Sequence, residues 1–179
     1  MKILKIALIA LATLIAVPLV VAAIAKKDYS VERSITINKP RAQVFAFVKL
    51  LKNQDQYSKW ATMDPAMKKT FTGTDGTIGF ISAWDSQDPN VGVGEQEIKG
   101  ITEGERLDFE LRFKKPFEAT DKAYMITESA GEKATLVKWG FNGHMKYPMN
   151  LMLLFMDFDK MLGGDLQIGL DNLKRVLEK

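Results

Sequence analysis

The first hydrophobic segment of the chain is one continuous run. Between Ile3 and Ile24 only Lys5 is charged, and the run has no polar face. About 20 helical residues extend for roughly 30 Å, the thickness of the hydrocarbon core of a bilayer. A surface helix of a soluble domain would need a polar side. The pattern therefore predicts a membrane-spanning helix over residues 3–24.

A cleaved signal peptide is the alternative for this segment. The apolar region of a signal peptide is usually about 7–15 residues long, shorter than this run, although Ala23-Ile24-Ala25 offers a small-residue cleavage site. Pro18 is compatible with a membrane helix, because neighbouring groups there satisfy the freed carbonyl. We expect residues 1–27 to be a membrane anchor, or else a signal peptide, and residues 28–179 to be one folded domain.

After the anchor the pattern changes to short segments in which apolar and polar residues alternate. A strand is predicted over residues 29–37, followed by a helix from Pro40 to Leu51. Leu107 to Phe113 alternate strictly, which indicates an antiparallel sheet with one buried face and one wet face. Turn residues separate six further strands, at 68–73, 78–85, 94–101, 106–114, 120–129 and 133–143.

The C-terminal segment returns to helical spacing from about Asn150 to Glu178. Its apolar residues recur every three or four positions, which predicts a long amphipathic helix: Phe155, Phe158, Leu162, Leu166, Leu170, Leu173 and Leu177. Gly163-Gly164 inside it indicates either close packing or clearance for a ligand. We expect an α+β arrangement in which a curved antiparallel sheet wraps around this helix.

Whether the net positive charge of the chain indicates a nucleic-acid partner depends on where the charges lie. The chain has 25 basic and 22 acidic residues, but four lysines and no acid lie in residues 1–27, which leaves 21 basic against 22 acidic residues. No basic stripe remains in the domain, which argues against nucleic acid as a partner. Two lysines flank each side of the span, and the α-amino group favours a cytoplasmic N-terminus with the domain outside the cytoplasm. Cleavage would instead give an exported soluble domain.

The composition leaves few residues for catalysis. The chain has no cysteine and one histidine, His144, which excludes thiolate chemistry and makes a metal site or a relay of bases improbable. We expect His144 on the surface or at a cavity rim, and Glu95 and Glu97 on the wet face of a strand. The sequence therefore predicts no catalytic residues, no metal and no cofactor.

Several stretches of the domain resemble one family. They are Pro40–Val48, Tyr57–Trp60, Asp64–Met67, Thr70–Gly73, Ala83-Trp84, Gly92–Gln96, Phe155–Gly164 and Gly169–Lys174. With the order of elements, these stretches resemble the START-like or Bet v 1-like (SRPBCC) superfamily, in its bacterial polyketide cyclase/dehydrase-like branch. The resemblance implies the helix-grip fold and a cavity between sheet and helix. The same fold carries binders and enzymes, so the site must decide the function.

The aromatic and methionine residues indicate where such a cavity lies. Residues of these types line hydrophobic ligand sites, with a few polar groups to orient the ligand. The predicted ligand-binding residues are Phe80, Ser82, Trp84, Gln96, Phe109, Leu111, Trp139, Phe141, Met152, Phe155, Met156 and Leu162. We expect a membrane-tethered, non-catalytic binder of a hydrophobic small molecule or lipid. A cyclase or dehydratase and an interaction module with a filled core are the alternatives.

Overall fold

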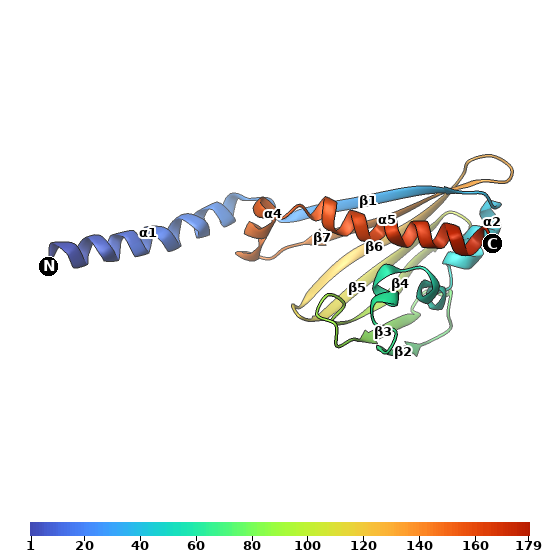
Figure 1. Cartoon of the computed structure of the whole chain (residues 1–179), viewed down its shortest axis with the longest axis horizontal. Coiled ribbons are helices and arrows are strands. Elements are labelled where there is room, and N and C mark those ends of the chain that lie inside the picture. The colour runs from blue at the N-terminus through green and yellow to red at the C-terminus, as the bar shows by residue number, and fades with distance from the viewer.

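The computed structural model describes residues 1–179 as an apolar helix joined to one curved sheet (Figure 1). Helix α1 (Lys2–Ile24) extends away from the domain and is long and apolar enough to cross a membrane. Ala22 is its only buried residue. The three residues 25–27 connect it to the first strand.

Seven antiparallel strands form the sheet in the order β1-β7-β6-β5-β4-β3-β2. The strands are β1 (Asp28–Ile37), β2 (Lys68–Thr72), β3 (Ile81–Asp85), β4 (Val93–Thr102), β5 (Arg106–Lys115), β6 (Ala119–Ser129) and β7 (Thr135–His144). The predicted strands are confirmed, with boundaries that shift by at most three residues. Irregularities in the β4–β5 register, at Val93/Gly94 and Ile98/Gly100, add to the curvature.

Strand alternation places the core on the concave face. In β5, Leu107 and Phe109 are buried, while Arg112 lies on the opposite face. Short helices close one end of the sheet: α2 (Arg41–Val48), the 3₁₀ helix η1 (Leu51–Gln56) and α3 (Lys59–Met63). The predicted helix from Pro40 to Leu51 is thus shorter, and helical turns follow it.

Helix α5 (Phe158–Leu177) covers the concave face. Leu166, Leu170 and Leu173 are buried at helical spacing. The Asp157 side chain accepts a hydrogen bond from the Lys160 N–H (2.9 Å) and so caps the helix start. The helix is continuous through Gly163 and Gly164.

The prediction that this helix begins near Asn150 is wrong. Residues before Asp157 form two short turns instead, η2 (Met149–Leu151) and α4 (Met152–Phe155). At Met156 the backbone is extended (φ −111°, ψ 131°), which ends α4 and lets Asp157 start a new helix. The apolar spacing continues across this break, which is why the sequence pattern does not reveal it.

Candidate functional site

A cavity of about 470 Å³ lies between the concave face of the sheet and α5. Of its 29 lining residues, 18 are hydrophobic. The sheet contributes inward-facing side chains such as Leu111 and Phe141, and α5 contributes Leu162 and Leu166. The core is therefore not filled, and the space falls in the range of about 300–1,000 Å³ typical of small-molecule sites.

Edge-on and tilted aromatic rings build much of the cavity wall. Trp139 meets Trp60 nearly at right angles with 6.2 Å between ring centroids, and Trp84 meets Phe113 in the same way at 6.1 Å. Trp84 lies across Gly94, where a Cβ would come within 2.6 Å of the indole. A glycine at this position therefore lets the indole occupy the wall of the cavity.

Helix α5 approaches the sheet closely at a second glycine. A Cβ on Gly169 would lie 2.7 Å from the Trp139 ring. At the start of the helix, Phe158 packs on Tyr29 with 5.0 Å between ring centroids. These two contacts hold α5 against the sheet at its start and near its middle.

Seven of the twelve predicted ligand-binding residues line this cavity: Ser82, Trp84, Gln96, Leu111, Trp139, Phe141 and Leu162. Phe80 and Phe109 lie in the packed core instead, 1% and 2% exposed. Met152, Phe155 and Met156 lie outside the cavity, on α4 and the residue after it. Their displacement follows from the break at Met156, which separates α4 from the helix that covers the sheet.

Asp121 is a lining residue that the sequence analysis missed. It is 6% exposed, and its carboxylate accepts a hydrogen bond from the His144 backbone N–H (2.9 Å). Burial raises the pKa of this carboxyl, and the hydrogen bond only partly opposes the rise. Burial, with the nearby Asp121 charge, also raises the pKa of Tyr29 to about 12. The alternation of β6 could have identified Asp121 from the sequence, because residue 121 shares a face with the apolar Ala123 and Met125.

Other polar side chains also line the cavity, and two of them form an ion pair with each other. Lys69, which lines the cavity, forms an ion pair with Asp55 (2.5 Å), which lines it as well. The buried Gln54 Nε2 has no hydrogen-bond partner. The cavity thus offers a ligand a carboxyl, an amide and an ion pair in mainly apolar surroundings.

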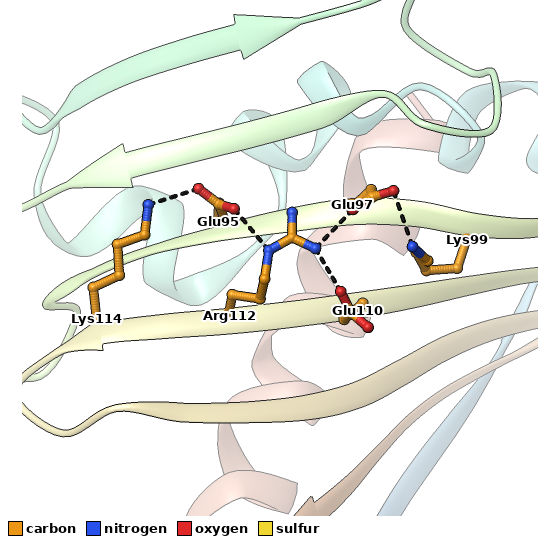
Figure 2. A network of polar contacts seen from close by, with 6 residues as sticks. All are labelled: Glu95, Glu97, Lys99, Glu110, Arg112 and Lys114. Carbon is orange, nitrogen blue, oxygen red and sulfur yellow. Dashed lines mark hydrogen bonds and ion pairs between the residues drawn. The ribbon is translucent and has the colours of Figure 1, made fainter.

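The residues considered for catalysis lie elsewhere. His144 is half exposed and pairs with Asp28 (2.6 Å) outside the cavity. Glu95 and Glu97 lie on the opposite face of β4, where Arg112 binds both at 2.7 Å (Figure 2). No group of three or more His, Asp or Glu residues is placed to hold a metal ion.

The fold is similar to that of several solved proteins. Norcoclaurine synthase from Thalictrum flavum, in complex with dopamine and hydroxybenzaldehyde, matches with a TM-score of 0.64 at 8% identity, over 88% of this chain and 90% of that chain. A protein from Thermobifida fusca matches at 0.59 and 16% identity, over 81% and 90%. Ara h 8.0201 matches at 0.55 and 14% identity, over 82% and 97%.

At these identities the likeness shows the fold alone. No curated protein matches the chain significantly. A family model described as polyketide cyclase/dehydrase and lipid transport matches residues 28–178, nearly the whole domain after α1. The chain therefore belongs to the polyketide cyclase/dehydrase and lipid transport family, within the Bet v 1-like (SRPBCC) superfamily.

Proposed function

We propose that this protein binds a hydrophobic small molecule or lipid, without catalysis, while α1 holds it at a membrane. The single observation that carries the proposal is the mainly apolar cavity of about 470 Å³ in a domain joined to an apolar helix. The family description, which includes lipid transport, supports the ligand class. Trp84, Leu111, Trp139, Phe141 and Leu162 would contact the apolar body of the ligand.

The polar lining residues would orient the ligand. Ser82 and Gln96 were expected in this role, and both line the cavity. Asp121 adds a carboxyl whose raised pKa favours the neutral form relative to an exposed aspartate. A carboxyl accepts hydrogen bonds in either protonation state, and so suits a hydroxyl group at the end of an apolar molecule.

Retention of α1 gives this cavity access to ligands in a bilayer. Its 23 residues extend for roughly 35 Å, enough to span the hydrocarbon core. We propose an uncleaved anchor with the domain outside the cytoplasm, because the α-amino group adds to the positive charge before the span. Hydrophobic ligands concentrate in the bilayer, so a tethered cavity meets them at high local concentration.

The test is native mass spectrometry of the full chain purified in detergent, with Leu111→Trp to fill the cavity. Leu111 lines the cavity, so the larger indole should abolish a bound mass that the unaltered chain retains. Lys122→Trp is the matched control, because Lys122 is exposed and the alternation of β6 places it on the outer face. A chain that never carries a ligand, or equal retention by both variants, would contradict the proposal.

A catalytic function is the second candidate, and Asp121 is the observation that favours it. A buried carboxyl with a raised pKa can act as a general acid. The fate of the bound molecule separates the two candidates. A binder releases its ligand unchanged, whereas a dehydratase releases a product lighter by one water, and Asp121→Asn would abolish that conversion.

A further inference from the structure

An uncharged and strongly exposed segment follows β7. Residues 147–156 contain no charged side chain. Phe155 is 85% exposed, Leu154 55%, and Tyr147 and Met149 47% each. Together with Met156 these residues form what we call the apolar platform. Large apolar side chains gathered in this way mark a contact surface for a partner or a membrane.

The platform is fastened to the end of α1. Asn150, which is fully buried within it, donates from Nδ2 to the Ala22 carbonyl (2.7 Å) and lies 3.3 Å from the Ala25 carbonyl. These contacts satisfy carbonyls that the end of a helix leaves without partners. The Met145 N–H also donates to the Lys27 carbonyl (2.8 Å). The platform therefore keeps a fixed position beside the residues where α1 would leave the bilayer.

The strand pairing places one exposed edge of the cavity, which we call the mouth, at the same end. Asp28, the first residue of β1 after the anchor, pairs with His144 at the end of β7. The His144 N–H in turn contacts Asp121 at the start of β6, just after the β5–β6 turn. Figure 1 shows this turn, α4 and the start of α5 at the end of the domain nearest α1. Phe117 on the turn and Met161 on α5 line the cavity and are also 71% and 47% exposed.

We propose that the apolar platform lies in the interfacial layer of the bilayer that α1 spans, and that it holds the cavity mouth against the lipid. The occupant of this surface is the bilayer, because the platform continues directly from the membrane-spanning helix. Lys26, Lys27 and Lys146 flank the junction, where their ammonium groups reach the phosphates of lipid headgroups while their stems stay in apolar surroundings. The inference rests on the proposed function in one respect, the retention of α1 as an anchor.

The absence of cysteine makes a direct test possible. The single-cysteine variants are Leu11→Cys in α1, Phe155→Cys in the platform, Phe117→Cys at the mouth and Glu132→Cys in the β6–β7 turn at the far end. Each carries an environment-sensitive nitrobenzoxadiazole label. The full chain is reconstituted into phosphatidylcholine–phosphatidylglycerol vesicles that contain lipids with nitroxide-bearing acyl chains. The nitroxide quenches labels that lie in the bilayer.

The expected result is strong quenching at positions 11, 155 and 117 and none at position 132. Quenching at 11 without quenching at 155 overturns the platform and leaves the anchor standing. Quenching at 155 without quenching at 117 overturns the orientation of the mouth. Absence of quenching at 11 shows that the anchor itself fails, and the platform proposal fails with it. Loss of the bound mass in Leu111→Trp is measured separately, so failure of ligand binding is distinguishable from each of these outcomes.

Discussion

The two adjacent glycines of α5 lead to opposite predictions for the same substitution. A Cβ on Gly163 would lie 2.1 Å from the Arg33 guanidinium, whereas a Cβ on Gly164 would meet nothing within 4 Å. Arg33 crosses Gly163 to form two hydrogen bonds with the Asp159 carboxylate, at 2.8 and 3.0 Å. It also donates to the Asp159 carbonyl (2.8 Å). Gly163 thus provides room for the clamp that joins β1 to the first turn of α5.

In a helix interior, alanine is more favourable than glycine by about 1 kcal/mol. Gly164→Ala should therefore raise the melting temperature by roughly 2–4 °C for a chain of this size. Gly163→Ala gains the same helix propensity but displaces the guanidinium, so it should not stabilise the protein and should release the start of α5. Thermal unfolding of the full chain in detergent, followed by circular dichroism, measures both variants.

A third variant isolates the cause of the difference. An Arg33→Ala background removes the three atoms that lie nearest to a Cβ on Gly163, so Gly163→Ala should there recover the stabilisation seen for Gly164→Ala. Equal stabilisation by both substitutions in the unaltered chain would refute the reasoning. The same would follow if removal of Arg33 left the effect of Gly163→Ala unchanged, because the clash would then not involve the clamp.

Two further predictions concern charge. Because burial raises the native pKa of Asp121 above its ordinary value of 3.8, the native state binds the proton more tightly, and stability should fall as pH rises from 3.8 through the native pKa. Asp121→Asn, which keeps an acceptor for the His144 N–H, should remove this fall and give a higher melting temperature than the unaltered chain at neutral pH; an unchanged pH profile would contradict the assignment. Glu95 accepts hydrogen bonds from Lys114 and Arg112, and Glu97 accepts them from Arg112 and Lys99. These bonds lower the pKa of both carboxyls below 4.5. The ionised carboxylates therefore stabilise the folded state above pH 4.5, and this stabilisation is lost as pH falls through the native pKa values. Arg112→Met should therefore lower the melting temperature at neutral pH, by an amount that shrinks in acid, and a deficit independent of pH would show that the arginine acts through packing alone.

The sheet could be predicted because each strand carries its own signal. In β5 the alternation of Leu107 and Phe109 with charged residues depends only on the period of two, and the structure keeps it. The sequence also predicts which charged residues lie on the outer face of the sheet, but not how they pair. The alternation places Glu95, Glu97 and Arg112 on the solvent-exposed face. Which of them form ion pairs depends on the register between β4 and β5.

The break before α5 could not be predicted from spacing alone. Met152 and Phe155 continue the apolar periodicity, so the pattern alone favours one helix. The deciding interactions are the cap at Asp157 and the docking of Asn150 on the end of α1, a contact across more than 120 residues. The Asn150 contact is long-range, and contacts of this kind override local propensity. Because of the break, three residues predicted to line the cavity lie outside it: Met152, Phe155 and Met156.

The register of the sheet, together with the short connection to α1, determines which way the cavity opens. Three residues between α1 and β1 span at most about 10 Å, and Asn150 fixes the end of the helix to the domain. The domain therefore cannot turn freely relative to α1. Because β1 starts where β7 ends, and β6 starts beside them, the β5–β6 turn must lie at the end of the domain nearest α1. If α1 spans a bilayer, as we propose, the topology alone makes a cavity between this turn and the start of α5 open toward it, whichever hydrophobic ligand the cavity binds.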